Sequence, residues 1–139
     1  VVEVQQTSDV TYRIYDWDRV DSEGKSRELH TSLAVDAIDF EADAELLHRK
    51  YNLGKGGEAK VIDCNYFSMT LHDVDGKKEL DRSSLDSFVV YIALNGSVRI
   101  VADGAEETLA EGEVILIPAE ANDIIIEGNA KLMEVYINR

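Results

Sequence analysis

The sequence predicts a mostly β protein that ends in an antiparallel sandwich or barrel, and three features indicate this. From Glu58 onward, short apolar runs follow one another with no helical spacing among them. Three dipeptides (Asp75-Gly76, Asn95-Gly96 and Asp103-Gly104) are typical of hairpin turns, in which both central residues need a positive φ. The sole proline, Pro118, stands just beyond a strand-like run, where the missing N–H donor costs little.

Composition restricts the classes of partner. The chain has 139 residues, which suits one domain with a core of ordinary size. Its 28 acidic and 14 basic residues give a net charge of −14, which argues against nucleic acid and against an anionic membrane surface. No apolar run approaches the roughly 18 residues that span a bilayer. A single cysteine cannot form an internal disulfide, which fits a reducing compartment, so we expect a cytoplasmic protein.

The N-terminal part is expected to form a strand pair. Residues 1–6 and 11–16 both alternate in polarity, and residues 7–9 between them are typical of a turn. The chain has no initiating Met and opens inside the first alternating run. We therefore expect it to be a piece of a longer polypeptide.

A short helix and a connection are expected next. Thr31 or Ser32 is placed to cap a helix that runs through Phe40, because apolar residues recur there at helical spacing. Residues 41–57 are acidic and then glycine-rich, which is typical of a linker. Eight strands are expected beyond it, at residues 59–63, 66–72, 88–94, 97–102, 106–109, 114–117, 123–127 and 130–137.

Two segments carry a resemblance to a known family. Residues 3–19 (EVQQTSDVTYRIYDWDR) resemble the strand–turn–strand of type I mannose-6-phosphate isomerases. As in that family, a loop and then the sequence RELH at residues 27–30 follow. Residues 112–119 (GEVILIPA) resemble the closing half of a cupin jelly roll. The resemblance implies a cupin-type antiparallel jelly-roll barrel with an N-terminal strand pair and one or two short helices.

The resemblance also implies how the chain is divided. Residues 1–22 would be a strand pair that belongs to the catalytic cupin of the parent enzyme, and residues 23–57 would form a loop, a short helix and a linker. Residues 58–139 would form a metal-free C-terminal cupin. The family holds a catalytic zinc in an earlier cupin, whereas the three histidines here are scattered and form no ligand cluster. We therefore expect zinc in the parent protein and no metal in this fragment.

Three site residues are carried over from the resemblance. Glu3 matches a pocket glutamate proposed to transfer protons, although the pattern alone favours a solvated strand carboxylate. Arg13 matches an arginine that faces the active site and contacts sugar or phosphate, the alternative being a surface salt bridge. Arg19 matches a substrate-binding lysine of some relatives, but it lies in a charged loop, which favours a solvated arginine. Glu3 and Arg13 are thus the catalytic candidates, and Arg19 the candidate for substrate binding.

Two functions remain open at this point. In the first, the parent is a zinc-dependent isomerase that interconverts mannose 6-phosphate and fructose 6-phosphate by proton transfer through an enediol, and this fragment alone is inactive. In the second, the chain is a non-catalytic cupin module that binds a sugar or a protein partner. In either case the N-terminal strands are expected to fold back onto the barrel or to pair with a second copy in a homodimer.

Overall fold

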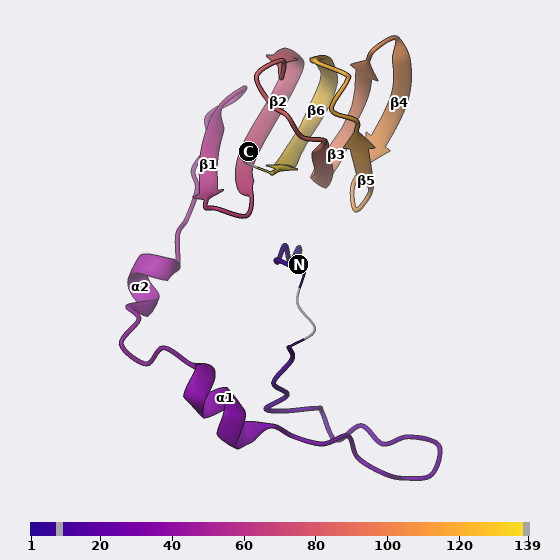
Figure 1. The fold of residues 1–139 in the computed structure, drawn as a ribbon. Coiled ribbons are helices and arrows are strands. Elements are labelled where there is room, and N and C mark those ends of the chain that lie inside the picture. Colours follow the sequence, from indigo (N-terminus) through magenta and orange to yellow (C-terminus); the bar gives the residue numbers. More distant parts are fainter. Residues whose placement is uncertain (8–9, 138–139) are drawn as a thin grey trace. The chain divides into compact units, whose positions relative to one another are not determined.

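The computed structural model describes residues 1–7 and 10–137 and divides the chain into two compact units, Val1–Arg49 and Lys50–Arg139. The first unit contains the helices α1 (Thr31–Ala37) and α2 (Ala44–Leu47), and the second contains strands only (Figure 1). Among the described residues, neither helix is long and apolar enough to cross a membrane. The mostly β class and the two short helices are confirmed.

The N-terminal strand pair predicted for residues 1–22 is absent from the described residues of this unit. Their backbone forms loops and turns, and the only β-type pairing there is an isolated bridge between Val20 and Ser26. A lone two-stranded hairpin is marginally stable in water unless a third strand or a packed face supports it. Here Ile14 and Tyr15 are exposed, so no such face is buried.

The predicted helix is shorter than expected and is capped differently. It begins at Thr31, but the N-cap position is occupied by His30, which makes no side-chain capping hydrogen bond. The helix ends at Ala37 because Ile38 adopts an extended conformation, with ψ 127°. Phe40 therefore lies beyond the helix.

The second unit is one antiparallel sheet. Its strands are β1 (Glu58–Asp63), β2 (Ser68–Asp81), β3 (Val89–Ala102), β4 (Ala105–Ala110), β5 (Val114–Ile117) and β6 (Asp123–Tyr136). They are ordered β1-β2-β6-β3-β4, and β5 pairs with the first part of β3 (Figure 1). The eight predicted segments thus become six strands, because two pairs of them join into the long strands β3 and β6.

Two of the three predicted hairpin turns are wrong for one reason: they are bends within long strands. Asp75-Gly76 lies within β2 and pairs with Asn129 and Gly128 of β6, and Asn95-Gly96 lies at a bulge in β3. Gly76, Gly96 and Gly128 all have positive φ, at 95°, 71° and 143°. Glycine at these points lets each long strand turn sharply and the sheet fold over itself.

Asp103-Gly104, in contrast, is the predicted hairpin. Both residues have positive φ, at 47° and 75°, and they connect β3 to β4. The folded sheet encloses one apolar core. Its members come from both ends of the long strands, as Tyr91 and Ile100 of β3 and Ile124 and Leu132 of β6 show. The predicted barrel is therefore the observed architecture of residues 58–137.

Candidate functional site

The site residues predicted from the sequence all lie in the first unit. Glu3 is exposed. Arg13 is half-buried, and its Nη1 donates to the backbone carbonyl of Glu28 at 3.1 Å. Arg19 is exposed and lies over the Trp17 ring, 5.9 Å from the ring centroid, in a cation–π contact. The described contacts do not bring these three side chains together, and their catalytic and binding roles stay predictions.

Local hydrogen bonds set the backbone position of Arg13. Its N–H donates to Nδ1 of His30 at 3.1 Å, and its carbonyl accepts from the His30 N–H at 2.7 Å. Only Nη1 of the guanidinium is engaged within the described residues, so Nε and Nη2 are available to a ligand. Nearby, Asp16 is buried against Arg27, whose hydrogen bond lowers the pKa of that carboxyl. The sequence pattern did not single out this ion pair.

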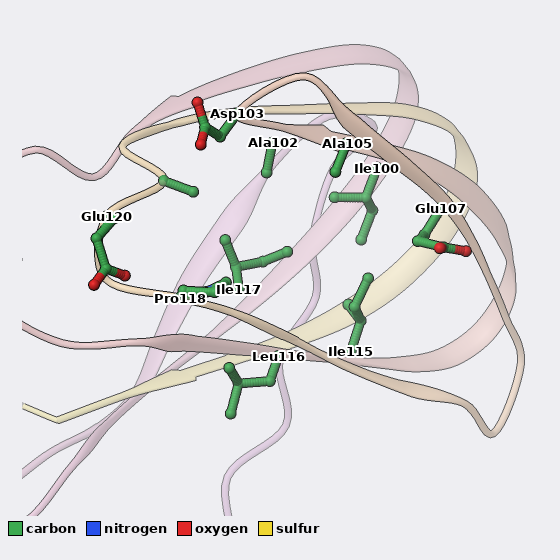
Figure 2. Close-up of a pocket in the computed structure, with 11 residues that line it drawn as sticks. Ile100, Ala102, Asp103, Ala105, Glu107, Ile115, Leu116, Ile117, Pro118 and Glu120 are labelled. Carbon is green, nitrogen blue, oxygen red and sulfur yellow. The ribbon is translucent and has the colours of Figure 1, made fainter.

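In the second unit, one cavity of 470 Å³ lies at the end of the barrel formed by the β3–β4 turn and the segment after β5 (Figure 2). Its wall is apolar and includes Ile100, Ile115 and Ile117. Carboxylates of Asp103, Glu107 and Glu120 lie along the lining, and no basic side chain is among the residues of the wall. This set offers no pairing of a base with an oxyanion donor, so we assign no chemistry to it.

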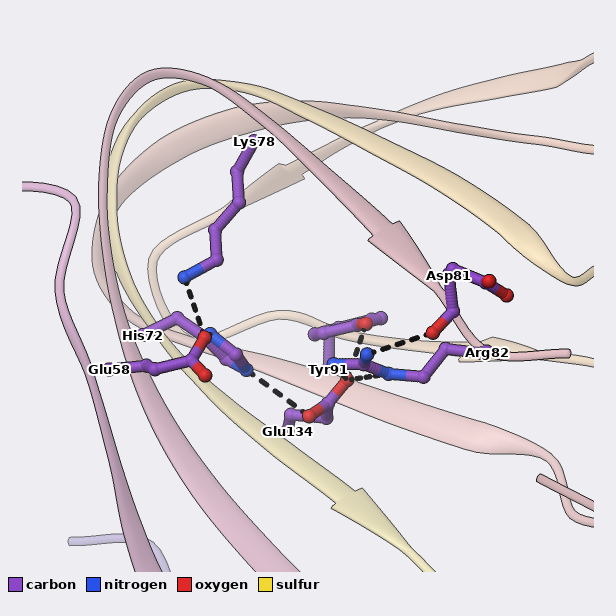
Figure 3. A network of polar contacts seen from close by, with 7 residues as sticks. All are labelled: Glu58, His72, Lys78, Asp81, Arg82, Tyr91 and Glu134. Atoms are coloured by element: carbon purple, nitrogen blue, oxygen red, sulfur yellow. Dashed lines mark hydrogen bonds and ion pairs between the residues drawn. The ribbon is translucent and has the colours of Figure 1, made fainter. Parts of the chain in front are cut away.

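A polar network in the same barrel is centred on Glu134 of β6 (Figure 3). Glu134 is only 1% exposed. Its Oε1 accepts from Nε of Arg82 at 2.9 Å, from Nη2 of Arg82 at 2.7 Å and from the Tyr91 hydroxyl at 2.7 Å. Its Oε2 lies 3.2 Å from Nε2 of His72. Each oxygen of this buried carboxylate therefore has a donor beside it.

These contacts determine the ionisation of the network. Burial alone would raise the pKa of Glu134, but hydrogen bonds from His72 and Tyr91 and the charge of Arg82 outweigh it and hold the pKa below its ordinary value. Burial and the neighbouring Glu134 carboxylate raise the pKa of Tyr91. Burial would lower the pKa of Arg82, but the Glu134 charge raises it above its ordinary value. Glu134 is thus ionised and Tyr91 is neutral at neutral pH.

A second carboxylate approaches His72 from the edge strand β1. Oε2 of Glu58 accepts from Nζ of Lys78 at 2.9 Å and lies 3.4 Å from Nδ1 of His72. The hydrogen bond from Lys78 lowers the pKa of Glu58. Although His72 is 1% exposed, its Nδ1 makes no hydrogen bond to any described residue. The imidazole thus stands between two carboxylates with only one nitrogen satisfied.

A cavity of 270 Å³ opens over this network and is lined by residues of β1, β2, β6 and the loop after β2 (Glu58, Lys60, Thr70, His72, Asp81, Arg82, Ser84, Leu85, Glu134 and Tyr136). Within the described residues, no group of three or more His, Cys, Asp and Glu side chains is arranged to hold a metal ion. Because Arg82, Tyr91 and His72 already surround the Glu134 oxygens, a zinc ion does not fit this donor set.

The sequence did carry one signal for this network. Leu132, Glu134 and Tyr136 share the inward face of β6, so an acidic residue stands where the alternation requires an apolar one. Its partners could not be read from the pattern, since His72 and Arg82 precede Glu134 by 62 and 52 residues. A buried charge in an alternating strand indicates a network but does not identify its members.

Comparisons with known proteins agree with this geometry. A family model described as the mannose-6-phosphate isomerase cupin domain matches residues 58–137. YvyI of Bacillus subtilis (strain 168) is 33% identical over 99% of this chain and 43% of its own length. The mannose-6-phosphate isomerase ManA of the same organism is 30% identical over 98% of this chain and 43% of its own length. The chain thus spans less than half the length of these curated relatives.

Solved structures support the same assignment. The mannose 6-phosphate isomerase of Bacillus subtilis superimposes with a TM-score of 0.70 and 30% identity, over 94% of this chain and 41% of that chain. A phosphomannose isomerase from Salmonella typhimurium shares the fold, with a TM-score of 0.53 and 21% identity over 63% of this chain. The cupin fold expected from the resemblance is confirmed, and the chain belongs to the mannose-6-phosphate isomerase cupin-domain family.

Proposed function

We propose that this chain is the C-terminal part of a mannose-6-phosphate isomerase that interconverts mannose 6-phosphate and fructose 6-phosphate by proton transfer through an enediol. The main support for this proposal is the extent of the similarity along the chain. The family model covers only residues 58–137, yet the similarity to YvyI extends over 99% of the chain and therefore includes the first unit. A cupin module that had been recruited for binding alone would need no such similarity before residue 58.

The first unit would supply the charged groups that act on the substrate. A guanidinium donates two parallel hydrogen bonds, which suits a phosphate or a developing oxyanion. Arg13 retains Nε and Nη2 for this purpose, while its Nη1 is held by Glu28. Glu3, an exposed carboxylate, would transfer the proton between adjacent carbons, and Arg19 would contribute to substrate binding.

The metal of the proposed enzyme would be held elsewhere. A divalent zinc supplies a Lewis acid that stabilises the oxyanion of an enediol. The described residues offer no ligand group for it, and the Glu134 network does not fit one. The role of this chain's own residues is therefore to bind and orient the phosphosugar and to move its proton.

The test is an isomerisation assay on the longer polypeptide that carries this chain. We expect conversion of mannose 6-phosphate to fructose 6-phosphate, and a loss of roughly 10²-fold in kcat/KM for Arg13→Lys, because a lysine cannot reproduce the paired donors. Arg49→Lys is the matched control, since Arg49 is exposed in the same unit and its one described hydrogen bond is to the carbonyl of Leu46 in α2. Equal activity of the two variants would show that Arg13 does not belong to the active site.

The alternative is a non-catalytic cupin module. It predicts that the longer polypeptide has no isomerase activity while the barrel still binds a sugar or a protein. Glu3 and Arg13 would then tolerate substitution without any functional effect. The same assay separates the two functions, because only the enzyme loses turnover when Arg13 is changed.

A further inference from the structure

We propose that the cavity over the Glu134 network is a binding site for a neutral polyhydroxylated molecule, such as a monosaccharide without a phosphate. The site lies entirely within residues 50–139 and does not depend on the isomerase activity of the parent. Three observations point to it: the size of the cavity, the pairing of its charges, and the unsatisfied nitrogen of His72.

The cavity has the dimensions and the lining of a small-molecule site. Its 270 Å³ is close to the lower limit of roughly 300 Å³ for ligand pockets. The floor is rigid, because Glu134, Tyr91 and Arg82 are tied together by hydrogen bonds of 2.7–2.9 Å. Leu85 and Tyr136 add apolar surface beside the charged groups. A polar floor next to an apolar wall suits a sugar ring, which has both kinds of face.

The two basic side chains of the lining, Lys60 and Arg82, are already paired with carboxylates. Arg82 uses Nε and Nη2 on Glu134 and Nη1 on a backbone carbonyl. Lys60 donates to Asp63, and Lys78 donates to Glu58. Each nitrogen of the Arg82 guanidinium already donates to an oxygen, so a phosphate would compete with Glu134 and the Asp81 carbonyl for this group. A hydroxyl group donates to a carboxylate and accepts from an ammonium, and so it binds without disturbing this balance.

Two polar atoms of the wall are available to such hydroxyl groups. Both described contacts of Glu58 are made by Oε2, so Oε1 can accept from a ligand. Nδ1 of the buried His72 ring makes no hydrogen bond to a described residue and lies 3.4 Å from Oε2 of Glu58. A hydroxyl group can both donate and accept, so it suits this nitrogen. A ligand hydroxyl that displaces Glu58 slightly would satisfy Nδ1.

The experiment is a titration of the ¹⁵N-labelled 139-residue chain, monitored by amide chemical shifts. D-mannose is the neutral probe, and inorganic phosphate is the anionic probe at matched ionic strength. We expect saturable shifts with D-mannose at amides that line the cavity, such as those of Thr70 and Ser84, and no saturable shifts there with phosphate. Glu58→Gln should weaken the binding of D-mannose about tenfold, since a charged acceptor becomes a neutral one.

The matched control is Glu79→Gln. Glu79 lies on β2 of the same unit, pairs with Lys77 and is absent from the cavity lining. It should leave the binding of D-mannose unchanged. Both Glu58 and Glu79 are largely exposed, at 57% and 68%, so neither variant should impair folding. Saturable binding of phosphate in place of D-mannose, no binding of D-mannose, or equal loss in both variants would overturn the proposal.

Discussion

Substitution Arg82→Met tests whether the interior of the barrel depends on the ion pair with Glu134. The change keeps most of the side-chain volume but removes the two hydrogen bonds to Glu134 and the compensating charge, and it leaves a carboxylate whose side chain is 2% exposed. Breaking a buried pair from one side costs about 3–5 kcal/mol. Since Tyr91 and His72 still contact Glu134, we expect the loss in the free energy of unfolding to be at the lower end of this range, about 3 kcal/mol at pH 7.

The dependence on pH distinguishes this cause from simple loss of packing. In the wild-type protein the folded-state pKa of Glu134 lies below the ordinary value of 4.5. Its ionised form therefore contributes stability above about pH 4.5, and this contribution is lost as the pH falls through the folded-state pKa. Without the Arg82 charge, we expect burial to outweigh the remaining hydrogen bonds and to raise the pKa of Glu134. The penalty of the variant is then full at pH 7 and decreases as Glu134 becomes protonated.

The assay is urea unfolding followed by far-UV circular dichroism at pH 7 and near pH 4.5. Tryptophan fluorescence is unsuitable, because the only tryptophan, Trp17, lies in the other unit. Arg99→Met is the matched control, since Arg99 pairs with Glu106 and Glu127 on the exposed surface of the same sheet. It should change the free energy of unfolding far less than Arg82→Met. Equal losses for both variants, or a loss for Arg82→Met that does not depend on pH, would refute the reasoning.

Two further predictions concern the fold. Gly96→Ala should cost more than about 4 kcal/mol, because its Cβ would lie 2.1 Å from the Asn129 carbonyl oxygen. Gly104→Ala, with a similar φ but open space around it, should cost only roughly 1–2 kcal/mol, and thermal unfolding of the two variants compares them. Residues 50–139 alone should unfold with the same free energy as the whole chain, because Ala34 is the one buried apolar residue in the described part of the first unit. A clear loss on truncation would show that the first unit stabilises the barrel.

The sequence predicted local features of the barrel well and its long strands poorly. Residues 114–117 form β5 as predicted, and β1 begins one residue earlier than expected. The error at Asn95-Gly96 has a physical reason. Positive φ is needed both in a hairpin turn and at a bend where two strands approach closely, so the dipeptide alone does not distinguish them. Only the register against β6 shows that β3 continues.

The prediction of an N-terminal strand pair was wrong for a different reason. Alternating polarity at residues 1–6 and 11–16 predicts a strand only if one face finds an apolar surface to cover it. In the first unit, large apolar side chains such as Tyr12, Trp17 and Phe40 remain exposed. The pattern is therefore that of a segment that needs a partner surface, and its strand propensity is not realised within this unit.

This difference between the units bears on the proposed enzyme. The Glu134 network is held by strands that pair along their whole length, so its geometry is fixed by the barrel itself. Arg13, in contrast, is positioned only by bonds to His30 and to Glu28 within an exposed segment. A catalytic group must be held closely in its productive position, which requires rigid packing around it. The first unit can provide such a site only where its exposed apolar side chains are covered, so we expect the 139-residue chain to show no isomerase turnover even when zinc and substrate are supplied.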